Sequence, residues 1–456
     1  MDLASHIFRQ YDIRGIVGKD LDPEVTRQVG KAYGSILREA LGGGQARVVV
    51  GQDNRPHSPD LAEGLMAGLL SAGVDVVSLG TVPTPLVLWA ESRLGTDGGI
   101  QITGSHNPAE YNGIKMTLGG RSFYGDDIQG LLQRLQQGNL LVGNGSLHHQ
   151  QIIPRYVEEI AAGFKLARPF RVVVDCGNGV GSLVAQDLLE AIGAEVIPLF
   201  CESDGTFPNH HPDPTVDEYL EDLIRLVREK EADAGIAFDG DADRIGAVDE
   251  TGAIVRGDIL LLLFGLDLLD RRGPGQKMIF DVKCSQALSE VFQEAGGEPI
   301  MWMTGHSHIK EKMKETGAPL GGELSGHICF ADEYIGIDDA PYAACRLVDL
   351  LARKGQAFSR IVASLPSYVA TPEIRIEVDE QKKWEVVELA LEHFRKDHEV
   401  IDVDGARILF GDGWGLLRTS NTQPVVVARF EARSEERLKE IQEVMESWLA
   451  TQGVHI

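Results

Sequence analysis

The sequence contains few cysteines and no long apolar run, and each lack excludes a class of protein. The five cysteines are scattered and form no C-x-x-C pair, so neither a disulfide framework nor a zinc site is indicated. The longest apolar run, Ile259–Leu266, is far below the ~20 residues that span a bilayer. Met1–Arg14 has no apolar signal core. We therefore expect a cytoplasmic protein with free thiols and no membrane segment.

Positive charge is also scarce. The chain of 456 residues carries 43 Lys and Arg against 69 Asp and Glu, a net charge of -26. This balance argues against nucleic acid and anionic membrane partners, whose binding depends on basic side chains. The proportions of apolar (43%) and charged (25%) residues are those of a soluble globular protein. An acidic protein that handles phosphate must concentrate its few cations locally.

Three well-known catalytic and nucleotide-binding motifs are missing. No G-x-x-x-x-G-K-[ST] occurs, which excludes a P-loop enzyme. Gly177–Gly181 follows an expected strand, but Ser182 stands where a dinucleotide fingerprint needs its third glycine, so we interpret it as a close strand–helix turn. No G-x-S-x-G surrounds Ser105, which removes the main support for a lipase-type hydrolase.

One pattern occurs three times: an apolar strand, a polar loop, an amphipathic helix, a glycine and a second strand. The first strands of the three copies are Val48–Asp53, which ends in a polar loop, Val172–Cys176 and Met278–Val282. The first helix runs from about Pro59 to Ala72, the second ends at Ala191 and the third ends at Ala295. The second strands are Gly73–Val77, Gly193–Ile197 and Gly296–Ile300. This order predicts three similar α/β domains in tandem. Ligands of such sheets bind beyond the carboxyl ends of the strands, where the polar loops lie.

The last part of the chain has a different pattern. Alternating residues at Glu373–Val378, a helix from about Gln381 to Arg395 and strands at Ala406–Phe410 and Val425–Phe430 predict an α+β domain. A closing helix is expected over Ser434–Leu449, with Ser434 as its N-cap. We therefore predict α/β domains over residues 1–150, 151–255 and 256–366 and an α+β domain over 367–456.

A polar stretch, Ile102–Pro108, follows an apolar run. Gly104 gives its backbone freedom, and Pro108 fixes φ and removes a donor. Ser105 stands beside His106, and a neighbouring base helps a weak serine nucleophile to attack. Taken alone, the pair also fits an ordinary turn, or a serine hydrolase or phosphatase.

Three carboxylates alternate in a loop between two apolar strands, at Asp239, Asp241 and Asp243, with Arg244 next. They repel one another unless a hard cation lies among them, and oxygen ligands suit Mg²⁺ or Ca²⁺ better than zinc. Glu250 falls at the twelfth position of an EF-hand loop, but Arg244 occupies the glycine position and the flanks are strands. A solvated acidic turn is the other alternative.

Several further loops carry groups that bind phosphate or sugar. An arginine stands on an early loop, a lysine lies after Ser105, and two polar loops end the strands of the third repeat; their residues are Tyr11, Arg14, Lys115, Lys283 and His306. Gly322–His327 offers an acceptor, a hydroxyl and an imidazole, which suits sugar hydroxyls. Arg418–Thr422 combines a guanidinium, hydroxyls and an amide in one loop between strands, the donor set that holds a phosphate. Each also fits an exposed polar turn.

In combination and order, four of these stretches resemble the α-D-phosphohexomutase superfamily, and most closely its bacterial phosphomannomutase/phosphoglucomutase branch. They are Thr103–Pro108, Asp239–Arg244, Gly322–His327 and Arg418–Thr422. The resemblance extends from Phe8 to the final helix and implies four domains around a deep cleft. It implies reversible conversion of hexose 1-phosphate to hexose 6-phosphate through a phosphoserine and a hexose 1,6-bisphosphate.

The resemblance also implies roles for individual residues. Ser105 would carry the phosphate, and Asp239, Asp241, Asp243 and that phosphate would hold Mg²⁺. Glucose 1,6-bisphosphate would be the activator. The non-reacting phosphate would be bound by Arg418, Ser420, Asn421 and Thr422, and the sugar O3 and O4 by Glu323 and Ser325. The cleft would be lined by Tyr11, Arg14, His106, Lys115, Arg244, Lys283, His306 and His327. The candidates for proton transfer would be Lys115, Arg14 and His327.

Two residues bear on the choice of sugar. The sequence resembles the phosphoglucosamine branch less. In that branch the position of Leu324 is usually occupied by Gln, and the serine loop begins Thr-Ala rather than Thr-Gly, so an amino sugar is not expected. Glucose and mannose differ only at C2, which O3 and O4 contacts do not read. We expect a small phosphosugar as partner and a monomer or weak homo-oligomer. A phosphosugar- or metal-binding protein without activity and a Ca²⁺ sensor stay open as alternatives.

Overall fold

The structure is a computed structural model, and it describes residues 4–379, 381–420 and 424–455. The chain divides into two compact units, one of Met1–Leu260 with Ser325–Arg360 and one of Leu261–Leu324 with Ile361–Ile456. The chain passes from one unit to the other within helix α8 (Gly257–Arg272), between Leu324 and Ser325, and within helix α12 (Phe358–Ala363).

The first sheet of unit 1 has the strand order β1-β5-β4-β2-β3-β7, with β6 beside β5. Strands β2, β3, β4 and β7 are parallel, and β5 is antiparallel to β4 and β1. Its strands are β1 (Ile13–Ile16), β2 (Ala46–Gln52), β3 (Val74–Thr81), β4 (Gly98–Ile102), β5 (Tyr111–Leu118), β6 (Arg121–Ser122) and β7 (Leu147–His149). Its helices are η1 (Ser5–Ile7), α1 (Pro23–Ala40), α2 (Ser58–Ser71), α3 (Thr84–Leu94) and α4 (Asp126–Gln137).

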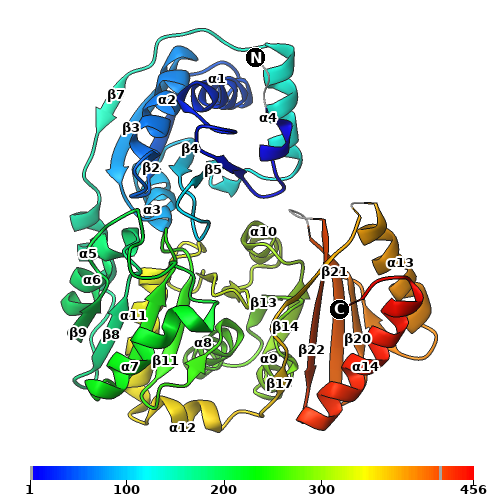
Figure 1. Cartoon of the computed structure of the whole chain (residues 1–456). Helices are drawn as coiled ribbons and strands as arrows, with labels where there is room; N and C mark the ends of the chain where they lie inside the picture. Colours follow the sequence, from blue (N-terminus) through cyan, green and yellow to red (C-terminus); the bar gives the residue numbers. More distant parts are fainter. Residues whose placement is uncertain (1–3, 380, 421–423, 456) are drawn as a thin grey trace. The chain divides into compact units, whose positions relative to one another are not determined.

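Helices cover both faces of this sheet (Figure 1). Val48 and Val50 point into a core that they share with α1, α2 and α4. Gly51 faces the other way, where Val87 of α3 packs against it. Because the strands are buried on both faces, they are nearly continuous apolar runs, as parallel strands usually are.

The second sheet of unit 1 has the order β12-β11-β10-β8-β9, in which β10, β8 and β9 are parallel and β11 and β12 antiparallel. Leu223 and Val227 of α7 pack on one of its faces. The elements are α5 (Ile153–Ala161), β8 (Arg171–Asp175), η2 (Val180–Leu183), α6 (Ala185–Ala191), β9 (Glu195–Leu199), η3 (Asp217–Leu220), α7 (Glu221–Glu229), β10 (Ala234–Phe238), β11 (Ile245–Asp249), β12 (Ile254–Val255) and α11 (Ala340–Lys354). Strand β16 (Ile328–Phe330) is also in unit 1 but is not a strand of this sheet.

Unit 2 contains the third repeat, whose strands β14, β13 and β15 are parallel. Helices α9 and α10 contact this sheet. The elements are β13 (Lys277–Asp281), α9 (Gln286–Glu294), β14 (Glu298–Trp302), α10 (His306–Thr316) and β15 (Leu320–Gly322). The predicted strand–helix–strand order is confirmed in all three repeats, and in each the two strands are parallel neighbours.

The rest of unit 2 is an antiparallel sheet of order β17-β22-β21-β20-β19, with β18 also beside β22. Helices α13 and α14 cover one face of it (Figure 1), which is the predicted α+β layout. The elements are β17 (Val369–Ala370), β18 (Ile374–Glu377), α13 (Lys382–Phe394), β19 (Glu399–Ile401), β20 (Ala406–Leu409), β21 (Gly413–Thr419), β22 (Val425–Ala432) and α14 (Glu435–Thr451). The predicted N-cap is confirmed, because Ser434 accepts a hydrogen bond from the Arg437 amide.

Two loop assignments from the sequence were wrong. Arg14 belongs to strand β1, where it pairs with Gly113 of β5, rather than to a loop. Arg418 and Thr419 end strand β21, paired with Val427 and Val426. In both cases glycines interrupt the apolar alternation that signals a strand, and long-range pairing determines the structure instead.

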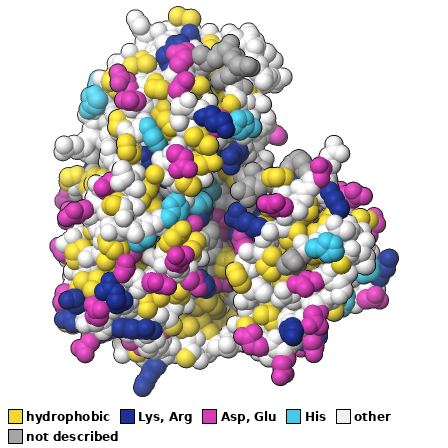
Figure 2. Space-filling view, in the orientation of Figure 1, with side chains coloured by type: hydrophobic (Ala, Val, Ile, Leu, Met, Phe, Trp, Pro, Cys, Tyr) yellow, Lys and Arg dark blue, Asp and Glu magenta, His cyan; other side chains and the backbone are white. Residues whose placement is uncertain are grey.

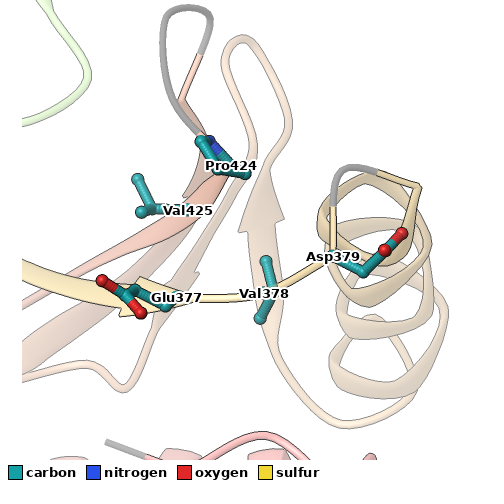
Figure 3. Close-up of a pocket in the computed structure, with 5 residues that line it drawn as sticks. All are labelled: Glu377, Val378, Asp379, Pro424 and Val425. Carbon is teal, nitrogen blue, oxygen red and sulfur yellow. The ribbon is translucent and has the colours of Figure 1, made fainter.

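Within the described ranges, no helix is long and apolar enough to span a membrane. The face of the molecule seen in Figure 2 carries acidic and basic side chains intermingled. One shallow pocket lies in unit 2, at the end of β18 and the start of β22, lined by Glu377, Val378, Asp379, Pro424 and Val425 (Figure 3). Its lining has two carboxylates and no cationic side chain, so it does not have the chemistry of a phosphate site.

Candidate active site

Ser105 lies in the loop that joins the end of β4 to the start of β5 in the first sheet. Its backbone has φ of +47°, a conformation uncommon for residues other than glycine and frequent at functional sites. Thr103 Oγ1 accepts the Ser105 amide at 2.8 Å, and Asp53 Oδ2 accepts the Gly104 amide at 2.9 Å. Two local hydrogen bonds thus fix the turn that presents the serine.

The hydroxyl of Ser105 is placed between a base and a carboxylate. Its Oγ lies 3.0 Å from His106 Nδ1 and donates to Asp239 Oδ2 at 3.0 Å. Burial, and next the positive charges of Arg244 and Arg14, hold the pKa of His106 well below its ordinary value. The His106 imidazole is therefore neutral at pH 7 and has a lone pair.

The three predicted carboxylates form one buried cluster. Asp239, Asp241 and Asp243 are all buried in the loop between β10 and β11, and their oxygens lie within 4.8 Å of one another. Asp241 Oδ1 and Asp243 Oδ1 are buried and accept no hydrogen bond from any residue in the described ranges. Buried carboxylate oxygens without a donor are costly unless a cation binds them. The cluster therefore fits a hard divalent cation, which prefers oxygen ligands.

Charge in this cluster is strongly perturbed. Burial, with repulsion from Asp241 and Asp243, raises the pKa of Asp239 well above its usual range. Burial alone would raise the pKa of Asp241 as well, but Lys115 and the Thr84 hydroxyl outweigh burial and lower it. Lys115 Nζ donates to Asp241 Oδ2 at 2.8 Å and to Asp243 Oδ2 at 2.5 Å. One ammonium thus compensates part of a triple negative charge.

Two arginines and a histidine surround the serine and the acidic cluster. Arg14 forms an ion pair with Asp12 and donates to Asn107 Oδ1 at 2.7 Å. Arg244 Nε donates to His327 Nε2 at 3.0 Å, so the ring proton of His327 is on Nδ1. This Nδ1 lies 3.2 Å from Asp338 Oδ2 and 3.6 Å from Asp243 Oδ1.

Three other predicted residues, Lys283, Arg418 and Glu323, lie in unit 2, each with a counter-ion or a backbone partner. Lys283 Nζ donates to Glu373 Oε1 at 2.6 Å, and this lysine lowers the pKa of Glu373 to about 2. Arg418 Nε donates to Asp404 Oδ2 at 3.1 Å, and the Gly305 amide donates to Glu323 Oε1 at 2.6 Å. These bonds hold the phosphate- and sugar-binding candidates in fixed orientations.

Comparison with known proteins decides the family. Four consecutive family models match the chain: phosphoglucomutase/phosphomannomutase alpha/beta/alpha domain I at residues 5–140, domain II at 154–252, domain III at 256–368, and the C-terminal domain at 373–447. The chain belongs to the phosphoglucomutase/phosphomannomutase family. This confirms the resemblance inferred from the four ordered motifs.

Individual relatives match this family member along nearly its whole length. It is 46% identical over 448 residues to "Phosphomannomutase/phosphoglucomutase" of Pseudomonas putida, covering 98% of this chain and 96% of the relative. It is 43% identical to "Phosphoglucomutase" of Neisseria gonorrhoeae, with 96% of each covered. A crystal structure of a phosphoglucomutase/phosphomannomutase family protein from Burkholderia thailandensis matches with a TM-score of 0.93, 44% identity and 98% coverage of both chains.

Within unit 1, the family member brings most of the predicted residues together. Hydrogen bonds or ion pairs connect Ser105 with His106 and Asp239, Lys115 with Asp241 and Asp243, and His327 with Arg244 and Asp243. Half-buried Tyr11 lies just before β1, and half-buried Ser325 lies in the loop before β16. In unit 2, His306 begins α10 and buried Ser420 follows β21. Asn421 and Thr422 lie outside the described residues.

Sequence reasoning missed several residues that support the site. They are Asp53, Arg55, Thr84, His211, Asp338, Glu373 and Asp404. Asp53 and Arg55 follow the first strand of the first repeat, where polar loops were expected to meet. Their position was therefore a usable signal, but their partners lie about fifty residues away in sequence. Glu250 was considered as a calcium ligand, and its carboxylate instead accepts the Ser359 amide at 3.0 Å.

Proposed function

We propose that this family member interconverts hexose 1-phosphate and hexose 6-phosphate, with Ser105 carrying the transferred phosphoryl group and a hexose 1,6-bisphosphate as intermediate. It is an isomerase of the intramolecular phosphotransferase type. The observation that carries the proposal is the position of Ser105 Oγ, 3.0 Å from both His106 Nδ1 and Asp239 Oδ2, at the edge of a buried acidic cluster. A hydrolase would need an attacking water in place of a sugar hydroxyl.

The cation in our proposal is Mg²⁺, held by Asp239, Asp241, Asp243 and a phosphate oxygen on Ser105. When bound, it supplies positive charge at the transferring phosphoryl group. The two donor-free oxygens of Asp241 and Asp243 support this ligand set. Without a cation, the three carboxylates would repel the phosphate that the reaction must bring there.

The proposed reaction moves one phosphoryl group twice. A hexose 1-phosphate binds, its free 6-hydroxyl attacks the phosphorus, the bond to Ser105 Oγ breaks, and a 1,6-bisphosphate results. The bisphosphate then turns end over end, its other phosphate returns to Ser105, and hexose 6-phosphate leaves. Glucose 1,6-bisphosphate activates because it phosphorylates Ser105 directly.

Proton transfer is assigned by the protonation state of the candidates. The sugar hydroxyl must lose a proton, and Arg14 and Lys115 are poor acceptors. Burial acts against their charge, yet Asp12 and Asp241, respectively, raise their pKa values overall. His327 instead has its lone pair at Nε2, which accepts from Arg244 Nε and becomes available for a proton when Arg244 turns to a substrate oxygen. We therefore assign the general base to His327 and charge stabilisation to Arg14 and Lys115.

The substrate contacts are proposed on donor chemistry. Arg418, Ser420, Asn421 and Thr422 would bind the non-reacting phosphate, and Glu323 and Ser325 the sugar O3 and O4. The remaining contacts would come from Tyr11, Arg14, Arg244, Lys283, His306 and His327. Mannose and glucose are both expected to react, whereas Leu324 gives no polar side-chain partner to an amino sugar.

Phosphorus NMR tests the function. The protein is incubated with Mg²⁺, trace glucose 1,6-bisphosphate and either glucose 1-phosphate or mannose 1-phosphate. We expect the 6-phosphate from both sugars, and no conversion by Ser105→Ala. Ser364→Ala removes a surface hydroxyl that donates to the Ile361 carbonyl, so it should retain activity. Inorganic phosphate would indicate a phosphatase, and binding without conversion would indicate a binding protein.

The proposal also covers the cellular compartment and the oligomeric state. All five cysteines are free thiols, which is typical of a reducing cytoplasm. We expect a monomer or weak homo-oligomer, and sedimentation equilibrium over a range of concentrations measures this. A tight dimer that persists at nanomolar concentration would contradict that expectation.

A further inference from the structure

The serine loop is held by its backbone carbonyls, one after another. Side chains donate to every carbonyl from Gly104 to Ala109. The donors, in the order of the carbonyls, are Arg14, Arg55, His211, Arg55, Arg55 and His57. Loop carbonyls usually face water. Here basic side chains bind all six carbonyls of the run, and Arg55 alone binds three of them.

Arg55 makes the largest contribution to this arrangement. Its Nη2 donates to the carbonyls of Ser105 (2.9 Å) and Asn107 (2.6 Å). Its Nη1 donates to those of Pro108 (2.6 Å) and Tyr111 (3.2 Å). The planar guanidinium has five donors in a fixed fork, so one side chain can tie four carbonyls in a set geometry.

Asp53 connects the same guanidinium to the turn at Gly104. Its Oδ2 accepts Arg55 Nε at 3.1 Å and the Gly104 amide at 2.9 Å. The Arg55 side chain has 0% exposure and that of Asp53 has 2%. Arg55 is therefore screened from any ligand, and its effect on the reaction must act through the loop.

Close packing makes the loop position sensitive to Arg55. A Cβ on Gly104 would lie 2.4 Å from Arg55 Nε and Cζ. On the other side, a Cβ on Gly240 of the acidic loop would lie 2.5 Å from the Ser105 carbonyl oxygen. The serine turn is thus confined between the guanidinium and the acidic loop, and a shift of either changes the distance from Ser105 Oγ to Asp239.

His211 holds the one carbonyl of this run that lies between two Arg55 contacts. Its Nε2 donates to the His106 carbonyl, and its ring packs edge-on against Tyr219 at 5.7 Å. His211 lies in the segment between β9 and α7, so a residue that follows the second α/β repeat also binds the serine loop.

We propose that Arg55 and His211 are positioning residues: they hold the backbone of the serine loop by its carbonyls, so that Ser105 Oγ stays within 3.0 Å of the Asp239 carboxylate. This inference rests on the proposed phosphoserine chemistry. A misplacement of about 1 Å at a reacting group costs on the order of 10²-fold in rate. Loss of these donors should therefore slow phosphoryl transfer and leave sugar binding nearly unchanged.

The first test is Arg55→Lys, whose single ammonium cannot reproduce the fork. Arg38→Lys is the matched control, because Arg38 of α1 also donates to backbone carbonyls, those of Ala72 and Gly43, beside the same first sheet. We measure kcat, KM, the melting temperature, and the single-turnover phosphorylation of Ser105 by glucose 1,6-bisphosphate with intact-protein mass spectrometry. We expect kcat and the phosphorylation rate of Arg55→Lys to fall about 10²-fold, with KM nearly constant and Arg38→Lys fully active.

A pair of variants at His211 keeps the test decisive if Arg55→Lys does not fold. His211→Gln retains a donor at about the position of Nε2, whereas His211→Leu removes it. Phosphorylation of Ser105 should be close to wild type in the first and at least about tenfold slower in the second, consistent with the loss of one hydrogen bond worth roughly 1.4 kcal/mol.

Two results would overturn the proposal. One is an Arg55→Lys variant that melts lower but keeps wild-type kcat, since a purely structural residue would behave so. The other is an equal rate in His211→Gln and His211→Leu. Failure of the proposed function is distinguishable, because the wild-type protein itself would then neither phosphorylate Ser105 nor interconvert the sugar phosphates.

Discussion

Lys115 Nζ donates a hydrogen bond of 2.8 Å to Asp241 Oδ2, and the two side chains are 14% and 0% exposed. The same ammonium reaches Asp243 Oδ2, while the Oδ1 atoms of both carboxylates accept no hydrogen bond within the described ranges. One edge of the acidic cluster is therefore neutralised by the chain itself. The opposite edge, with the two Oδ1 atoms, is able to hold a cation.

Replacing Lys115 should make the protein more dependent on metal. Lys115→Met leaves Asp241 and Asp243 buried without their ammonium, which should cost about 3–5 kcal/mol of folding free energy without metal. Added Mg²⁺ should then raise the melting temperature more than it does in the wild type, because a competing positive charge is gone. Thermal denaturation with and without MgCl₂ measures both effects.

Lys19→Met is the control for this substitution. Lys19 is exposed, and its loss should change stability by no more than about 0.5 kcal/mol. Equal Mg²⁺-induced shifts in Lys115→Met and wild type would show that Lys115 and the metal do not share the same charge cluster.

Asp239→Asn should separate metal binding from stability. Burial and repulsion already disfavour the charge of Asp239, so the neutral amide should leave the metal-free protein as stable as the wild type or more stable. The variant should lose the stabilisation that Mg²⁺ gives the wild type, which is about 2.7 kcal/mol when the metal is at a hundredfold of its Kd. Turnover should fall with it.

Asp249→Asn is the matched control for Asp239→Asn. Asp249 is also buried, but its carboxylate accepts from Thr251 and Ala253 within a turn. We expect a lower melting temperature and an unchanged Mg²⁺-induced rise. A full Mg²⁺ response in Asp239→Asn would contradict the proposed ligand set.

A methyl group at Gly240 should push the acidic loop away from the serine loop. The added Cβ of Gly240→Ala would lie 2.5 Å from the Ser105 carbonyl oxygen, so one of the two loops must shift. We expect kcat to fall on the order of 10²-fold. Gly130→Ala in α4 has no atom within 4 Å of its Cβ and should add about 0.5–1 kcal/mol of stability without affecting kcat. Normal activity of Gly240→Ala would show that the loops have room to separate.

The sequence contained enough information for the layers of the fold, because apolar periodicity is local. Val48–Val50 and Val172–Asp175 are buried on both faces and were found as continuous apolar runs. Strand β21 was missed, because Gly413 and Gly415 interrupt its alternation and its pairing with β20 and β22 is long-range. Arg14 was placed in a loop for the same reason.

Short motifs identified the chemistry of the site but not its support. Ser105 and the three carboxylates stand in compact sequence motifs, so they could be found from residue type and spacing. Arg55 stands in no such motif: its place after the first strand of the first repeat was a signal, but its role depends on partners that only the fold brings near it. Lys115 was found by its nearness to Ser105 in sequence, whereas its contacts to Asp241 and Asp243 depend on how two α/β sheets face one another within unit 1.

Asp339 should make the stability of unit 1 depend on pH in an unusual direction. It caps α11, accepts from the Tyr156 and Tyr334 hydroxyls, and is buried, and burial raises its pKa to about 6. A carboxyl with a raised pKa stabilises the fold most below its unfolded value of about 4, and this contribution, about 3 kcal/mol, is lost as the pH rises through 6. Asp339→Asn removes the titration, so the difference in unfolding free energy between wild type and variant should shrink from pH 4.5 to pH 7.5 in urea denaturation. A difference that stays constant over this pH range for Asp339→Asn would contradict the prediction.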